Sequence, residues 1–190
     1  FEPNKDLYKE IEDKKIPNSM LINKAIDNQD KENVIFNIAS KDSISSLKEL
    51  NVNSSWFKLR KKQFENNKSE FIKQTHVDVA RLSTFLEQEN IENLEILIID
   101  TQGNTLNVLK SCESYLQKSC FDFIIAEIIY DNCYGSSEKI MDIENYLVSF
   151  GYGTIGMHSQ SSLFEDCGQV DMVYGSREVI SGIELQKTQK

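Results

Sequence analysis

Residues 94–104 (LEILIIDTQGN) carry the clearest structural pattern in this 190-residue chain. The run from Leu94 to Ile99 is nearly continuous aliphatic, which is typical of a parallel strand covered on both faces. Asp100 follows directly, and Gly103 allows a sharp turn there. Beyond the turn, apolar side chains recur every three or four residues and place one stripe on a helix, at Leu106, Leu109, Cys112 and Leu116. The stretch therefore predicts the strand, turn and helix of an α/β sheet.

Toward the C-terminus the same alternation continues. The run from Phe121 to Ile129 predicts a second buried strand, and two further strands are expected from Tyr152 to Met157 and from Val170 to Tyr174. Between the strand that ends at Ile129 and the one that begins at Tyr152 lies an amphipathic helix that ends at Gly151, with its apolar residues at Ile140, Ile143, Leu147 and Phe150. This order of elements predicts an open, doubly wound α/β sheet.

Toward the N-terminus the pattern is less regular. A short helix with an apolar side at Leu7, Tyr8 and Ile11 is expected after Asn4, a plausible N-cap. Another is expected at Leu82, Phe85 and Leu86, for which Ser83 could cap the free amides. Strands are expected from Ser19 to Ile26, from Asn33 to Ile38 and from Phe71 to Val79. No break in composition divides the chain, so residues 1–190 are expected to form one domain.

Composition excludes several classes of protein. The net charge of −9 argues against nucleic acid as a partner, and the one basic cluster, Lys58 to Lys62 (KLRKK), is short enough for a solvated helix face. The longest apolar runs are about half of what a membrane helix needs. The four cysteines show no C-x-x-C spacing, so no metal site is expected. Reduced thiols in a cytoplasmic protein are the plainer interpretation.

Three acids fall at or near the carboxyl ends of expected strands: Glu2, Asp100 and Glu127. Ligands of open α/β sheets bind outside those ends. A carboxylate there can accept a hydrogen bond from a ribose hydroxyl, hold a cationic group or take a proton from a substrate hydroxyl. Gln102 is expected to face the same crevice as Asp100. The alternative is that each acid only caps the turn or helix that follows it.

Several stretches together resemble the FkbM family of methyltransferases, in the same order and with the same spacing across essentially the whole chain. They include FEPN at residues 1–4, NIAS at 37–40, VDVARLSTFL at 77–86, LIIDTQGNTLNVLK at 97–110, IIAE at 124–127 and the L-x-x-x-G-Y segment that ends at Tyr152.

The resemblance implies an S-adenosylmethionine-dependent O-methyltransferase that acts on a hydroxyl of a sugar, glycan or similar small metabolite. It also implies a Rossmann-like sheet whose first strand and glycine-rich loop lie upstream of Phe1. By the same resemblance Glu2 binds the cofactor ribose, while the backbone around Ala25, Ile26 and Asp27 flanks the adenine. Asp100, supported by Gln102 and Glu127, holds the ammonium group of the cofactor and orients or deprotonates the acceptor.

Two positions depart from the family pattern. Ile98 stands where the family has Lys, and Thr105 stands where it has Glu. Both departures favour an alternative, a degenerate methyltransferase fold that serves as a non-catalytic binding domain. An unrelated nucleotide-binding α/β enzyme is a third interpretation. The acceptor pocket is expected in the loops from Ser40 to Lys68 and from Asp131 to Ser137, and no motif identifies the acceptor or the oligomeric state.

Overall fold

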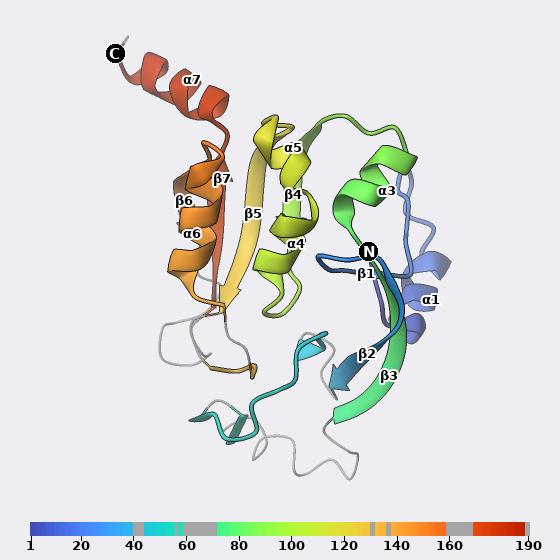
Figure 1. The fold of residues 1–190 in the computed structure, drawn as a ribbon. Coiled ribbons are helices and arrows are strands. Elements are labelled where there is room, and N and C mark those ends of the chain that lie inside the picture. Colours follow the sequence, from blue (N-terminus) through green and yellow to red (C-terminus); the bar gives the residue numbers. More distant parts are fainter. Residues whose placement is uncertain are drawn as a thin grey trace.

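The computed structural model describes residues 1–39, 44–55, 57–58, 72–129, 132–135, 138–158 and 169–188, with side chains as far as residue 183. Trp56, Cys167, and most of the KLRKK cluster and of the loop from Ser40 to Lys68 lie outside this part of the chain. The described strands form two mixed sheets, and helices pack against them (Figure 1). The predicted α/β class is confirmed.

The larger sheet has four strands in the order β4 (Leu94–Ile99), β5 (Phe121–Ile129), β7 (Gln169–Gly175) and β6 (Gly153–His158). The β4 and β5 strands are parallel, whereas β7 is antiparallel to both of its neighbours. Helices α4 (Thr105–Ser111), α5 (Glu113–Gln117) and α6 (Ile140–Ser149) cover one face of this sheet in Figure 1. The last helix, α7 (Arg177–Thr188), follows β7 and was not predicted.

The smaller sheet has the order β1 (Ala25–Ile26), β3 (Ile72–Ala80) and β2 (Lys31–Ala39). The β1 strand is parallel to β3, and β2 is antiparallel to it. Helix α1 (Lys5–Asp13) precedes this sheet, and helix α3 (Leu82–Gln88) connects β3 toward β4. The predicted single sheet is thus replaced by two, because among the described residues β4 pairs only with β5.

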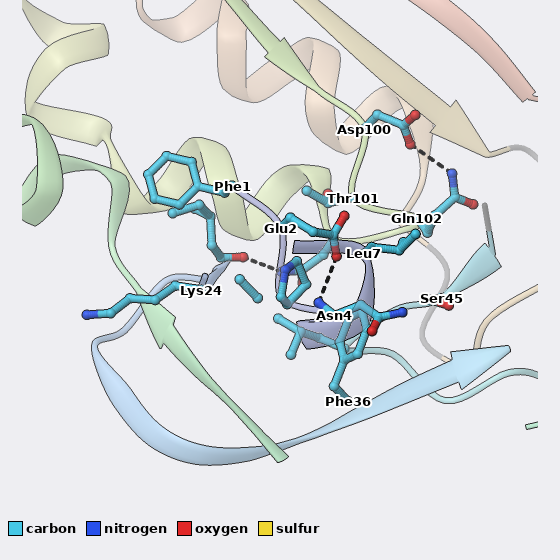
Figure 2. Close-up of a pocket in the computed structure, with 15 residues that line it drawn as sticks. Phe1, Glu2, Asn4, Leu7, Lys24, Phe36, Ser45, Asp100, Thr101 and Gln102 are labelled. Atoms are coloured by element: carbon cyan, nitrogen blue, oxygen red, sulfur yellow. Dashed lines mark hydrogen bonds between the residues drawn. The ribbon is translucent and has the colours of Figure 1, made fainter. Parts of the chain in front are cut away.

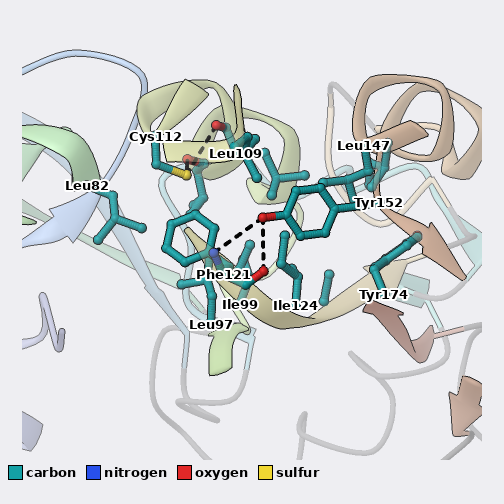
Figure 3. Close-up of a cluster of buried hydrophobic side chains, with 14 of the residues drawn as sticks. Leu82, Leu97, Ile99, Leu109, Cys112, Phe121, Ile124, Leu147, Tyr152 and Tyr174 are labelled. Atoms are coloured by element: carbon teal, nitrogen blue, oxygen red, sulfur yellow. Dashed lines mark hydrogen bonds between the residues drawn. The ribbon is translucent and has the colours of Figure 1, made fainter. Parts of the chain in front are cut away.

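One buried apolar cluster joins the two sheets, as it extends from Ile26 of β1 to Tyr174 of β7. The stripe that the sequence predicted lies inside it, with Leu109, Cys112 and Leu116 fully buried (Figure 3). Tyr152 ties β6 to β5, because its hydroxyl donates to the carbonyl oxygen of Phe121 at 3.0 Å and accepts from the amide of the same residue at 3.3 Å.

Some local expectations are confirmed and others are wrong. Asn4 caps α1, since its side chain accepts from the amide of Asp6 at 3.0 Å. The N-cap of α3 is Arg81, without a side-chain cap, and Ser83 lies inside the helix. The strand expected from Ser19 is confined to Ala25–Ile26, where β3 supplies a pairing partner. The single helix expected from Leu106 to Leu116 is two helices that meet at Cys112.

The expectation that β4 is covered on both faces is also wrong. Leu97 and Ile99 point into the core, whereas Ile96 and Ile98 are 51% and 68% exposed on the opposite face. Alternate residues of a strand face opposite sides of the sheet, so one face of β4 carries large apolar side chains without cover from the described residues. In the same part of the chain, no helix is long and apolar enough to cross a membrane.

Candidate functional site

A cavity of about 310 Å³ opens where three separate segments of the chain meet (Figure 2). Its walls come from the N-terminal segment at Phe1, Glu2 and Asn4, from the end of β1 at Ala25 and Ile26, and from the turn after β4. Phe36, Leu7 and Leu47 add apolar surface. A cavity with apolar walls and a few convergent polar groups is the usual form of a small-molecule site.

The N-terminal segment is held firmly against its surroundings. Oε1 of Glu2 accepts from the amide of Asn4 at 2.7 Å, and the Glu2 amide donates to the carbonyl oxygen of Ile22 at 2.9 Å. Nδ2 of Asn23 donates to the carbonyl oxygen of Glu2 at 2.8 Å. The ring of Phe1 packs edge-on against Phe85, with ring centroids 4.9 Å apart. The Glu2 carboxyl is therefore fixed at the N-terminal end of α1, beside the cavity.

The turn after β4 has an unusual backbone. Gln102 and Gly103 have φ values of +51° and +85°, and a left-handed conformation costs an ordinary residue about 1–2 kcal/mol. The hydroxyl of Ser46 donates to the carbonyl oxygen of Gln102 at 2.7 Å and stabilises the turn. This turn brings the side chains of Asp100 and Gln102 to the cavity, as the sequence predicted.

Gln102 joins two carboxyl groups. Its Nε2 donates to Oδ1 of Asp100 at 2.8 Å and to Oε2 of Glu127 at 2.7 Å. Burial of Glu127 is the largest cause that raises the pKa of this carboxyl, to about 8, followed by the charge of Asp100, a hydrogen bond with Asp100, and the charge of Asp171. Glu127 is therefore mostly protonated at neutral pH.

The sequence placed three residues beside the adenine, and they lie at the end of β1. Ala25 and Ile26 line the cavity. Asp27 is not among the lining residues, and its Oδ1 accepts from Nδ2 of Asn104 at 3.3 Å. The same Nδ2 donates to the carbonyl oxygen of Ile26 at 3.1 Å. Asn104, which is 2% exposed, thereby ties the smaller sheet to the turn after β4.

The structure thus brings five of the predicted site residues to one cavity, namely Glu2, Ala25, Ile26, Asp100 and Gln102. Glu127 lines a separate, smaller hollow, together with Tyr134 and Glu138. Sequence reasoning missed Asn104, Ser46 and Tyr134, which hold the site. The only signal for Asn104 was its place after Gly103, and for the other two their location in the loops expected near the acceptor.

The family model of the FkbM methyltransferase domain matches residues 1–153, which is most of the chain. The chain belongs to the FkbM methyltransferase family. The resemblance seen in the sequence is confirmed by this match. No curated protein and no solved structure matches this FkbM domain. Among the described residues, no group of three or more His, Cys, Asp or Glu side chains is arranged to hold a metal ion.

Neither departure from the family pattern lines the cavity of this FkbM domain. Ile98 is on the exposed face of β4. Thr105 is 1% exposed, and its Oγ1 donates to the carbonyl oxygen of Glu127 at 3.0 Å. The carboxyl group of Glu138 lies at the start of α4, where it accepts a hydrogen bond from the amide of Leu106 at 2.9 Å. Neither Ile98 nor Thr105 therefore contributes to the lining of the cavity.

Proposed function

We propose that this FkbM domain binds S-adenosylmethionine and methylates a hydroxyl of a sugar, glycan or similar small metabolite. The observation that carries the proposal is the cavity itself, because carboxylates from two distant segments, Glu2 and Asp100, border one apolar hollow. A nucleoside with a cationic tail has the matching chemistry, since it offers a flat base, ribose hydroxyls and an ammonium group.

Each part of the cofactor has a partner of fitting chemistry. Glu2 would accept from the ribose hydroxyls, and Ala25 and Ile26 would contact the adenine, with Asp27 held nearby by Asn104. Asp100 would bind the ammonium group. When bound, S-adenosylmethionine supplies an activated methyl group, and the protein contributes mainly by holding the acceptor oxygen close to it.

The carboxyl pair would serve the acceptor. Gln102 donates to both acids, and Glu127 is mostly protonated at neutral pH. Asp100 is the member that lines the cavity, so it is the group that would orient the acceptor hydroxyl and take its proton. The acceptor would enter past residues 44–55 and 132–135, the described parts of the loops expected to form its pocket.

We also propose that the sheet continues beyond β4 with a strand from an upstream part of the polypeptide, which would bring the glycine-rich loop of the family. The support is that, among the described residues, no strand pairs with the edge of β4 away from β5. The side chains of Ile96 and Ile98 on this strand are also exposed. An exposed apolar edge strand invites pairing. Hydrogen exchange tests this, since the β4 amides that do not face β5 should exchange quickly in the 190-residue chain and slowly when the upstream part is present.

Residues 1–190 are proposed to act as one domain, because the main core cluster includes residues from β1 through β7. Cys112 and Cys120 carry free thiols. We propose a reducing compartment such as the cytoplasm on that basis.

Methyl transfer to a panel of sugar acceptors tests the function. Asp100→Asn keeps the size of the side chain and removes its charge, so it should lower the rate at least about tenfold. Asp122→Asn, the same change at an exposed position of β5, should leave the rate unchanged. A wild-type rate for Asp100→Asn would contradict a catalytic role and would mean that this acid only caps the turn that follows it. A folded protein that binds no cofactor would instead support the non-catalytic alternative.

A further inference from the structure

The side-chain amide of Gln102 has a hydrogen-bond partner for every polar atom. Nε2 donates both of its hydrogens, one to Asp100 and one to Glu127, and Oε1 accepts from the hydroxyl of Tyr134 at 3.2 Å. An amide can also lie with its oxygen and nitrogen exchanged. That orientation would place Oε1 against the oxygens of two carboxyl groups, so the carboxyls themselves favour the orientation that the structure has.

Tyr134 holds the oxygen end of this amide. Its hydroxyl has one hydrogen, which is shared between the carbonyl oxygen of Ile44 at 3.3 Å and Oε1 of Gln102 at 3.2 Å. The residue is 3% exposed. The hydroxyl satisfies the amide oxygen of Gln102 in the interior, where an acceptor without a donor costs about 1–3 kcal/mol.

The position of Tyr134 is set by a docked pair of loop segments. A β-bridge joins Leu50 to Tyr134, and the backbone on each side is bonded as well, with the amide of Asn51 donating to Cys133 and the amide of Gly135 donating to Glu49, both at 2.8 Å. These segments share a buried apolar cluster of Ala39, Ile44, Leu50, Phe57, Cys133 and Tyr134. The hydroxyl therefore stays in place only while both segments are docked.

We propose that Tyr134 is a positioning residue that fixes the Gln102 amide between Asp100 and Glu127, and so couples docking of the acceptor-side loops to the charge state of the carboxyl pair. The catalytic part of this inference rests on the proposed methyl transfer. The positioning part concerns only the contacts of the chain itself, so it can be tested separately.

The consequence is a change in the titration of Glu127. The ionisable groups that act on this carboxyl are Asp100 at the end of β4 and Asp171 of β7, and Glu138 lies across the small hollow at the start of α6. Gln102 counters these acids by donating to the ionised form of Glu127. Without the Tyr134 hydroxyl the oxygen end of the amide is no longer held, Nε2 donates less well to the ionised form, and the pKa of Glu127 rises further.

The test is a pH titration of the glutamate carboxyl carbons by nuclear magnetic resonance, in the purified 190-residue chain and in Tyr134→Phe. The variant removes only the hydroxyl and keeps the ring in its apolar cluster. We expect the midpoint of Glu127 to rise by at least about half a pH unit. Tyr146→Phe is the matched control, because its hydroxyl donates to the distant Glu113, and it should leave the midpoint unchanged.

The same substitution made in a Gln102→Met variant tests whether the shift of the Glu127 midpoint acts through the Gln102 amide. In Gln102→Met there is no amide to orient, so adding Tyr134→Phe should shift the midpoint no further. An unchanged midpoint in the folded Tyr134→Phe variant, or an equal shift in the Gln102→Met background, would overturn the proposal. In a protein that transfers methyl groups, Tyr134→Phe should also lower kcat about threefold to tenfold and leave the KM for S-adenosylmethionine nearly unchanged. Failure of methyl transfer in the wild type would remove the proposed function without affecting the titration.

Discussion

A Cβ atom placed on Gly103 would lie 2.9 Å from Cδ2 of Tyr134, so the tyrosine ring packs directly on the turn that carries Gln102. Glycine meets two separate requirements at this position, a φ of +85° and contact with an aromatic ring. The ring in turn holds the hydroxyl that donates to Gln102. The backbone of the turn and the carboxyl pair are therefore stabilised by the same side chain.

Gly103→Ala should destabilise the protein through both requirements. A left-handed alanine costs about 1–2 kcal/mol, and displacement of the ring adds to it, so the free energy of unfolding should fall by at least about 2 kcal/mol in urea denaturation. Gly182→Ala is the control, since a Cβ there meets nothing within 4 Å and the residue lies in α7. That variant should gain up to about 1 kcal/mol. Equal stabilities for the two variants would contradict the packing described here.

Glu127 should make stability depend on pH. Its pKa in the folded protein is raised from 4.5 to about 8, so between these values the folded state binds more protons than the unfolded state. The contribution is fully present below about pH 4.5 and is lost as pH rises through about 8. Each tenfold change in the acid dissociation constant corresponds to about 1.4 kcal/mol, so the loss is on the order of a few kcal/mol.

Glu127→Gln mimics the protonated acid and should remove most of that slope. The measurement is the free energy of unfolding at intervals from pH 5 to 9. Glu95→Gln, at an exposed glutamate of β4, should keep the slope of the wild type. If Glu127→Gln is as pH-dependent as the wild type, the carboxyl does not titrate as described.

The local elements of this fold were largely predictable, because apolar periodicity reports directly on burial. The run from Phe121 to Ile129 matches β5 at both ends, and α6 begins at Ile140 as its apolar spacing indicates. Pairing between strands was less predictable. Continuous aliphatic residues in β4 indicate a strand buried on both faces, but the pattern does not reveal which partner covers Ile96 and Ile98, and the described residues provide none.

Some residues of the candidate site were likewise predictable from the sequence, and others were not. Asp100 and Glu2 were predictable, since acids at strand ends of an open α/β sheet reach its ligand edge. Tyr134 and Asn104 were not, because their roles depend on contacts between segments distant in sequence, such as the bond of Asn104 to Ile26. The pKa of Glu127 also depends on burial and on neighbours that share no local motif with it.

Asn104→Ala tests the link between the two sheets. Nδ2 of Asn104 bonds to Ile26 and Asp27, and its Oδ1 accepts from Nδ2 of Asn107 at 2.9 Å. Loss of these buried bonds should lower the free energy of unfolding by about 1–3 kcal/mol. Asn145→Ala, at an exposed position of α6, should be neutral or slightly stabilising. A neutral Asn104→Ala would mean that the hydrogen bonds of Asn104 do not hold the two sheets together.

The central claim, that the cavity between Glu2 and Asp100 holds S-adenosylmethionine, is tested most directly by calorimetric titration. S-adenosylmethionine and S-adenosylhomocysteine are titrated into the polypeptide that includes the upstream strand. We expect both to bind with dissociation constants in the micromolar range. Glu2→Gln should weaken binding about tenfold, in line with the loss of hydrogen bonds to a charged group. Glu10→Gln, at an exposed position of α1, should leave binding unchanged. Absence of binding by the folded protein, or preferential binding of a dinucleotide, would contradict the claim.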